Sequence, residues 1–551
     1  MSNPSTLAVQ SPSPRAGIAR SKAAGALLAI IFLALSASAI WAGLRLRQWI
    51  YPASEQFRFH YDINNAWTQG RGVVDDARQL DPAADRVPVA NLMRAFLSRY
   101  DTAIQNHPDG DYQLDYPPAR LLIMSIWVWR QTDDGKGPLP QASMFGAHFW
   151  SSQQQTGPAD LAGPLLDINT LFELAAMAGA FMLTRAVLRR GGVKWADFLA
   201  LGPAILLWFN PALLLDAHVW PQWEAWPLPF WLWAGYFAVT RRWLASGMCL
   251  GLGAMFKGQI ALTMGVFILW PLFQWRLRAL LDVVVGILFG AMLETSPWML
   301  WSLTAKIVFG IVLVATFVLL PRLPRRWRMT ALCGIVGCSL LLSGLMLWGD
   351  FAWWRVGFIY GADRWTDMNR GPAPNLPQTL SNDYGWQTMD VVYTLDLPRF
   401  GVHTDITMQE ALGAVYALGL LLASIAAALQ DSRNDRRLLL ALGAPWLVMF
   451  AILPQMHERY LVWGAALTAL AVAVSVGTTL LHVLVTITAC IPIALSLPGS
   501  GDFQRQYPWL GNLLGHANDH LSWVTVLVAI IWIYLSLAGG WRSKAALPQR
   551  E

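Results

Sequence analysis

The sequence predicts an all-α polytopic membrane protein, and three observations support this fold class. The chain has 551 residues, of which 55% are hydrophobic and only 13% are charged, about half the charged share of a soluble domain. Apolar runs of about 20 residues, long enough to cross a bilayer as a helix, recur along most of the chain. The polar residues gather in two long stretches, 45–163 and 350–407. We therefore expect one polytopic unit instead of several soluble domains.

The N-terminal region predicts a cytoplasmic tail followed by a membrane anchor. The segment 1–23 starts with many Ser and Pro residues, a composition typical of disorder. The first apolar run, 24–44, is longer than the apolar core of most signal peptides. We predict that it stays attached as an anchor. Cleavage near the small residues 36–39 is the alternative.

The next elements follow from run length. In the first polar stretch, the apolar segment 121–129 is too short to span and predicts an interfacial helix. The spans expected before the second polar stretch are 165–189, 197–216, 223–240, 243–257, 259–275, 279–296, 298–320 and 329–349. Those expected after it are 408–429, 438–455, 459–477, 478–497 and 522–541. With the anchor, the transmembrane domain 24–541 would hold about 14 helices, and 542–551 would be a second cytoplasmic tail.

The orientation follows from the Lys and Arg residues of the short connections. An even number of spans puts both termini on one side, and that side holds most of these basic residues, including those at 241–242, 276–278, 322–328 and 433–437. Positive charge marks the cytoplasmic side. Both termini are therefore predicted to be cytoplasmic, and both long loops to be periplasmic. The pattern fits the inner membrane of a bacterium.

Two other classes of protein are excluded by the distribution of residues. The net charge is +6, but the basic residues occur singly or in pairs between apolar runs and form no stripe suited to nucleic acid. The four cysteines lie inside apolar runs, without the spacing of a metal site or a disulfide framework. Most of the 30 Trp residues, Trp270 and Trp275 among them, are expected in the interfacial belts.

Unusual polar clusters fall at the predicted outer ends of the helices. They are His60–Asp62, Asp115–Pro118, Asp216–His218, Phe256–Gln259 and Met456–Tyr460. One charge at a helix end can reach the interface without functional meaning. Because several clusters converge on one face, the pattern favours a functional site there.

The residue types in these clusters indicate group transfer. Asp62 is a carboxylate that could take a proton from a hydroxyl, whereas Lys257, His457 and Arg459 are donors suited to an anion such as phosphate. Nucleotide sugars and ATP are not supplied outside the cell. A phosphate donor linked to a membrane lipid is therefore the expected substrate.

Four short motifs resemble those of a known family. Leu114–Pro118 reads LDYPP, Asp216–Gln222 contains Asp-Ala-His and a later Gln, Phe256–Leu262 reads FKGQIAL, and Met456–Leu461 reads MHERYL. In this order they resemble motifs of the GT-C superfamily, the polytopic glycosyltransferases that use polyprenyl-phosphate sugars. The similarity is to the dolichyl-phosphate-glucose glucosyltransferases and to bacterial mannosyl- and hexosyltransferases.

The resemblance implies a reaction and roles for particular residues. Asp62 would be the catalytic base of an inverting transfer from a polyprenyl-phosphate sugar to a hydroxyl of a glycolipid, polysaccharide or protein. The residues implied in binding the donor phosphate or sugar are Lys257, Gln259, His457, Glu458 and Arg459. Asp115, Asp216 and His218 would support the site. An extra Gly lies between Lys257 and Gln259, where the family motif has none.

Several alternatives remain open on the sequence. The family often has paired acidic residues in the first loop, so Asp75–Asp76 is the rival to Asp62. Asp115 could equally have a helix-start or turn role before the pair Pro117–Pro118. No metal ligands are assigned and metal-free transfer is favoured, with a divalent metal as the alternative. The rival functions are a polysaccharide ligase or polymerase that uses diphosphate-linked donors, and a lipid or sugar transporter.

Overall fold

The computed structural model describes residues 14–53, 60–112, 114, 116–132, 162–295, 303–348, 352–361, 367–368, 371–400, 402–497, 501 and 505–538. The contacts divide the chain into two units, Met1–Arg47 and Gln48–Glu551. The first unit contains most of helix α1 (Pro14–Ala53). The remaining helices and both strands lie in the second unit.

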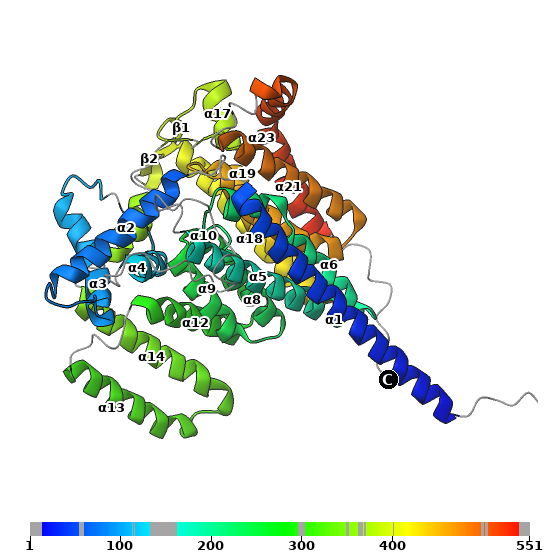
Figure 1. Ribbon diagram of the computed structural model, residues 1–551, viewed down its shortest axis with the longest axis horizontal. Coiled ribbons are helices and arrows are strands. Elements are labelled where there is room, and N and C mark those ends of the chain that lie inside the picture. Colours follow the sequence, from blue (N-terminus) through cyan, green and yellow to red (C-terminus); the bar gives the residue numbers. More distant parts are fainter. Residues whose placement is uncertain are drawn as a thin grey trace, which may run out of the picture. The chain divides into compact units, whose positions relative to one another are not determined.

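The second unit consists mainly of helices (Figure 1). Its N-terminal helices are α2 (His60–Gln79), α3 (Val89–Asn106), α4 (Pro118–Thr132), α5 (Gly163–Arg190), α6 (Ala196–Trp208), α7 (Pro211–Leu214), η3 (Leu215–Val219) and α8 (Pro227–Val239). The central helices are α9 (Trp243–Phe256), α10 (Gln259–Thr263), α11 (Gly265–Phe273), α12 (Leu277–Thr295), α13 (Leu303–Leu319), η5 (Leu320–Arg322) and α14 (Arg325–Trp348). The later elements are α15 (Ala352–Trp354), η6 (Arg355–Ile359), α17 (Leu376–Tyr384), β1 (Val391–Leu397), η7 (Pro398–Phe400), β2 (Val402–Thr407), α18 (Met408–Arg433), α19 (Leu438–Ile452), η8 (Glu458–Tyr460), α20 (Leu461–Thr468), η9 (Ala469–Ala473), α21 (Val476–Ser496) and α23 (Pro508–Leu537).

Six helical segments in the described part of the chain are long and apolar enough to cross a membrane. They are Ala26–Tyr51, Gly163–Arg190, Ala196–Val219, Met408–Arg433, Val476–Ser496 and His520–Leu537. Their length and composition indicate an integral membrane protein. The prediction of about 14 spans is wrong.

The overestimate has a physical reason. Several predicted spans form only short helices: α8 has 13 residues, α9 has 14 and α19 has 15. At 1.5 Å per residue these helices are about 20–23 Å long, less than the ~30 Å hydrocarbon core. The predicted span 259–275 is divided between α10 and α11. The length of an apolar run does not reveal such interruptions.

Both polar stretches contain more regular structure than the sequence indicated. In the first, α2, α3 and α4 pack on one another (Figure 1), and α4 includes the predicted helix 121–129. In the second, β1 and β2 form an antiparallel hairpin with Leu397 opposite Val402. The fold is therefore mostly helical, and the prediction of an all-α chain is wrong at this hairpin. Alternating polar and β-branched residues, as in Val402–Thr407, are typical of such strands.

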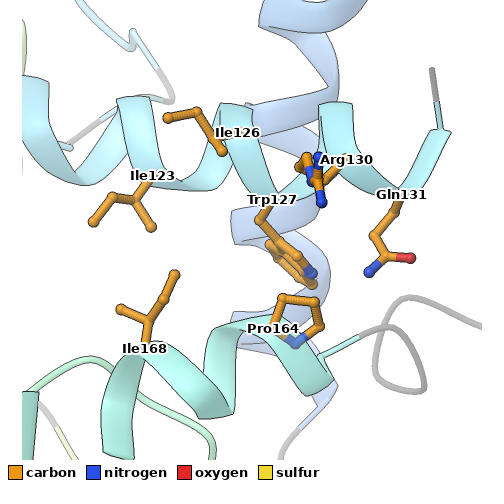
Figure 2. A pocket seen from close by; sticks show the side chains of 7 residues that line it. All are labelled: Ile123, Ile126, Trp127, Arg130, Gln131, Pro164 and Ile168. Atoms are coloured by element: carbon orange, nitrogen blue, oxygen red, sulfur yellow. The ribbon is translucent and has the colours of Figure 1, made fainter. Parts of the chain in front are cut away.

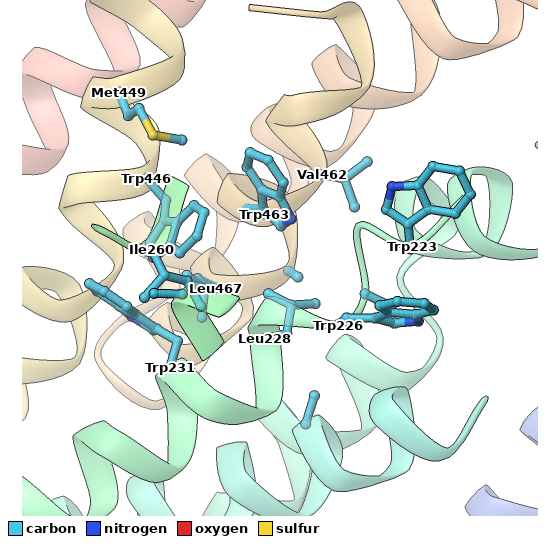
Figure 3. Close-up of a cluster of buried hydrophobic side chains, with 14 of the residues drawn as sticks. Trp223, Trp226, Leu228, Trp231, Ile260, Trp446, Met449, Val462, Trp463 and Leu467 are labelled. Carbon is cyan, nitrogen blue, oxygen red and sulfur yellow. The ribbon is translucent and has the colours of Figure 1, made fainter. Parts of the chain in front are cut away.

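Tryptophan side chains form part of the core. Trp231 and Trp446 lie edge to face with ring centroids 5.3 Å apart, and Trp446 packs in the same way on Trp463 at 5.0 Å (Figure 3). Trp270 is fully buried among the helices, whereas Trp275 is exposed. The buried rings join α8, α19 and α20 and so fix the segments that carry the polar clusters.

Helices α9 and α12 pack closely because each has glycines at the contact. A Cβ atom on Gly247 would lie 2.1 Å from the carbonyl oxygen of Val283, and one on Gly251 would lie 2.1 Å from that of Ile287. No Cβ atom can approach a backbone oxygen so closely. Small residues four apart allow helix backbones to approach in this way.

Replacing Gly247 by Ala should therefore lower the free energy of unfolding by about 1–3 kcal/mol, as in other overpacked interiors. The matched control is Gly413→Ala in α18, where a Cβ atom would meet open space. That change should stay within about 0.5 kcal/mol of the wild type. Unfolding in mixed micelles measures both. Equal stability of the two variants would contradict the close packing of α9 and α12.

Candidate functional site

The predicted base Asp62 lies in the first turn of α2 and is held through one carboxylate oxygen. Its Oδ2 accepts hydrogen bonds from Gln222 Nε2 at 2.6 Å and from Trp220 Nε1 at 3.1 Å. Arg459 Nη1 lies 3.5 Å from the same atom. The other oxygen, Oδ1, receives no hydrogen bond from the described residues, and 17% of the side chain is exposed. One oxygen is therefore fixed, and the other is available to a ligand.

A second carboxylate, Glu224, organises the cations of the site. Its side chain is fully buried, with Lys257 Nζ 3.0 Å from Oε2 and Arg459 Nε 3.2 Å from Oε1. The backbone oxygen of Glu224 accepts a hydrogen bond from Trp463 Nε1 at 2.7 Å. Our sequence reasoning missed Glu224. The sequence did offer one indication of it, since Glu224 is a single carboxylate among Trp residues in an apolar run. An unpaired charge is costly in such a run, so Glu224 needs a partner.

Breaks in the helices position these two cations. Lys257 follows α9 with extended backbone angles (φ −151°, ψ 115°) before α10 begins, and Arg459 lies in the short 3-10 helix η8. Aromatic rings surround both charges: Lys257 Nζ is 5.0 Å from the ring centroid of Tyr460, and Arg459 Cζ is 5.4 Å from that of Trp220. Rings at these distances stabilise cations where water is excluded.

The buried charges shift one another's protonation equilibria. Burial by itself would raise the pKa of the Glu224 carboxyl, but the charges of Lys257 and Arg459 outweigh it and hold this pKa below its usual range. Burial lowers the pKa of Lys257, and the Glu224 charge opposes this effect. For Arg459, the Asp62 and Glu224 charges outweigh burial and raise the pKa. The arrangement therefore favours an ionised Glu224 between two cations.

Asp216 and His218 are buried in η3 and make no contact with Asp62 that the structure records. His218 Nε2 lies 2.9 Å from Glu173 Oε2, and both side chains are fully buried. Both carboxylate oxygens of Asp216 are buried without a hydrogen-bond partner among the described residues. The backbone oxygen of Asp216 accepts a hydrogen bond from the backbone N–H of Gln222 at 2.9 Å. These residues are thus placed to support the segment that carries Trp220 and Gln222.

Asn169, a second residue that our sequence reasoning missed, also fixes this segment. Its Nδ2 donates to the backbone oxygens of Ala217 at 2.9 Å and Gln222 at 2.6 Å. Its Oδ1 accepts a hydrogen bond from Trp226 Nε1 at 2.7 Å. No motif indicated it.

The remaining predicted residues are less closely connected to Asp62. His457 Nδ1 lies 3.6 Å from Glu458 Oε2, so these two neighbours pair with each other. No hydrogen bond joins the Gln259 side chain to Asp62 or Glu224 in the described structure. Asp115 lies outside the described residues.

The rival carboxylates Asp75 and Asp76 are each paired with an arginine. Arg71 Nε lies 2.8 Å from Asp75 Oδ1, and Arg99 Nη1 lies 3.2 Å from Asp76 Oδ2. They are 13 and 14 residues after Asp62 on the same helix, or about 20 Å along its axis. The structure therefore separates them from the cations Lys257 and Arg459.

A pocket of about 300 Å³ lies elsewhere, between α4 and the start of α5 (Figure 2). Its lining is mostly apolar and consists of Ile123, Ile126, Trp127, Arg130, Gln131, Pro164 and Ile168. None of the residues predicted for the site lines it. Among the described residues, no group of three or more His, Cys, Asp or Glu side chains could hold a metal ion.

The protein is thus a mostly helical integral membrane protein, and its candidate site is a cluster of buried charges around the partly exposed carboxylate of Asp62. No protein-family model matches the chain, and no curated protein matches it at a significant level. The function must therefore be argued from the chemistry of the cluster.

Proposed function

We propose that the protein is a glycosyltransferase that moves a sugar from a polyprenyl-phosphate donor to a hydroxyl group of a glycolipid, polysaccharide or protein. The observation that carries the proposal is the way in which the two carboxylate oxygens of Asp62 are hydrogen-bonded. One of its carboxylate oxygens is fixed by Trp220 and Gln222, and the other receives no hydrogen bond from the described residues. A general base needs this combination of fixed orientation and access to the proton that it removes.

In the proposed reaction, Asp62 takes the proton of the acceptor hydroxyl as that oxygen attacks the anomeric carbon of the sugar. A new C–O bond forms to the acceptor, and the bond between the anomeric carbon and the phosphate oxygen breaks. The electron pair of the broken bond leaves with the polyprenyl phosphate. Attack opposite the leaving group inverts the anomeric configuration.

The cations near Asp62 suit the negative charge that develops on the leaving phosphate. Arg459 reaches toward both Asp62 and Glu224, so it lies between the base and the second cation, Lys257. Preorganised positive charge stabilises a developing anion strongly where water is excluded. Glu224 keeps the two cations in place before the donor arrives.

The compartment and the carrier belong to the same proposal. The distribution of Lys and Arg supports a site on the periplasmic face of a bacterial inner membrane, where undecaprenyl phosphate would be the carrier. The donor would enter from the membrane lipids, and the reaction would need no metal ion.

The test is a transfer assay with the purified full-length protein in lipid nanodiscs. It uses a panel of radiolabelled polyprenyl-phosphate hexoses and pentoses, with lipids extracted from the source cells as acceptors. One donor should be consumed, releasing polyprenyl phosphate and a labelled product of inverted configuration. Transfer should continue in EDTA.

Other outcomes would contradict the proposal. Consumption of a diphosphate-linked donor, with all monophosphate donors untouched, would favour the polysaccharide ligase. Movement of an intact lipid or sugar between the two leaflets, without release of polyprenyl phosphate, would favour the transporter.

A further inference from the structure

A third cation, Arg120, is buried near the site and contacts two aromatic rings. It lies in the first turn of α4, and only 7% of the residue is exposed. Its Cζ atom is 3.6 Å from the ring centroid of Tyr116 and 4.1 Å from that of Trp223. The two ring centroids are 5.9 Å apart and the ring planes differ by 65°, so the rings contact the guanidinium from two different sides and hold it in place.

The guanidinium of Arg120 donates no hydrogen bond to the described residues. Within the described residues Arg120 has no ion pair, and its Nε is buried without a hydrogen-bond partner. A buried charge without a partner is costly. Such an arrangement indicates a binding site for an anion.

The two other cations of the site already have a buried carboxylate as a partner. Lys257 and Arg459 both contact Glu224, so an anion that binds to them must compete with a buried carboxylate. An anion that binds to Arg120 displaces no carboxylate of the described residues. Its planar edge also matches two oxygens of a phosphate, which a lysine cannot do.

Arg120 belongs to the same site as the base. Its charge acts on both Glu224 and Lys257. Trp223, which stacks on it, is the residue between Gln222, the partner of Asp62, and Glu224. An anion bound at the edge of the guanidinium would therefore lie next to the proposed reaction centre.

We infer that Arg120 binds a phosphate oxyanion and is the residue that recognises the phosphate of the donor. The lipid-linked source of this phosphate rests on the proposed function, whereas binding of the oxyanion does not. A free phosphate would present the same chemistry, so the experiment separates the two sources.

The experiment measures binding to the full-length protein in nanodiscs of a zwitterionic lipid. The probes are undecaprenyl phosphate, uncharged undecaprenol and inorganic phosphate. The variants are Arg120→Gln, Arg120→Lys and, as a matched control, Arg130→Gln, which removes an exposed arginine from the same helix. Thermal midpoints are recorded for all of them.

The wild type should bind undecaprenyl phosphate more tightly than undecaprenol. Arg120→Gln should weaken binding of undecaprenyl phosphate by about 10- to 100-fold, as expected when a charge-assisted pair is lost, and should leave undecaprenol binding unchanged. Arg120→Lys keeps the charge but loses the planar edge, so its affinity should be intermediate. Arg130→Gln should bind like the wild type.

The remaining outcomes separate the inference from the proposed function. Equal binding of undecaprenyl phosphate by the wild type and Arg120→Gln would overturn the inference and leave the proposed function standing. Binding of inorganic phosphate but not of the lipid, lost in Arg120→Gln, would support the oxyanion site and contradict the lipid donor. If the wild type binds neither phosphate probe, the inference is wrong. Equal losses of affinity in both Arg120 variants, each with a matching fall in thermal midpoint, would assign Arg120 a structural role and also overturn it.

Discussion

Replacing Asp62 by Asn should lower the rate of sugar transfer by about 10²- to 10⁴-fold, the usual contribution of a general base. An amide has nearly the shape of a carboxylate and can still accept the hydrogen bond from Gln222 through its oxygen. It cannot remove a proton from the acceptor. The fall should therefore appear in kcat, with the KM for the donor changed much less.

The matched control is Asp75→Asn, which makes the same change farther along α2. Asp75 is paired with Arg71, and both side chains are nearly half exposed, so the loss of this pair should cost about 1 kcal/mol or less. Transfer by this variant should remain close to that of the wild type. If Asp75→Asn is inactive and Asp62→Asn retains activity, the base lies in the rival pair. The assignment of Asp62 would then be wrong.

Replacing Asp431 by Ala should lower the free energy of unfolding by about 3–5 kcal/mol, as when one member of a buried ion pair is removed. The Asp431 side chain is fully buried near the end of α18. Its oxygens lie 2.8 Å from Arg190 Nη1 and 2.7 Å from Arg241 Nη1. Gln274 Nε2 also donates to Asp431 Oδ2 at 2.8 Å. These contacts join α18 to the end of α5 and to the residues that follow α8 and α11, so the substitution leaves several donors unpaired.

Asp197→Ala is the matched control, because Asp197 also pairs with two arginines. Arg185 and Arg189 both lie 2.7 Å from its oxygens, but 41% of the Asp197 side chain is exposed. Water can replace the lost contacts, so the expected cost is about 1 kcal/mol or less. Unfolding of both variants by SDS in mixed micelles measures the difference. Similar losses at the two positions would show that burial does not set the strength of these ion pairs.

The close approach of Lys257 and Arg459 illustrates the limits of sequence reasoning. Each residue stands out locally, because a charge beside an apolar run needs an explanation. Their shared partner, Glu224, is 33 residues from Lys257 and 235 residues from Arg459. Pairings over such separations depend on how the helices pack. No run length or motif reports them.

The predicted number of membrane spans was wrong for a related reason. The apolar run 259–275 satisfies a count of hydrophobic residues, but regular α-helix is interrupted within it at Met264, between α10 and α11, and ends at Phe273. A helix that is buried among other helices is also apolar, whether or not it is long enough to cross the bilayer. The six long helices agree with predicted spans because their length leaves little room for another arrangement.

Composition and the length of apolar runs were enough to predict a mostly helical protein integral to a membrane, because both are local properties of the chain. The sequence also singled out Asp62, Lys257 and Arg459 as candidates for a site. The packing of the helices brings Gln222 to Asp62 and Glu224 to both cations, and it places Arg120 against the rings of Tyr116 and Trp223. These relations depend on distances between residues remote in the chain, which exist only after the helices have packed.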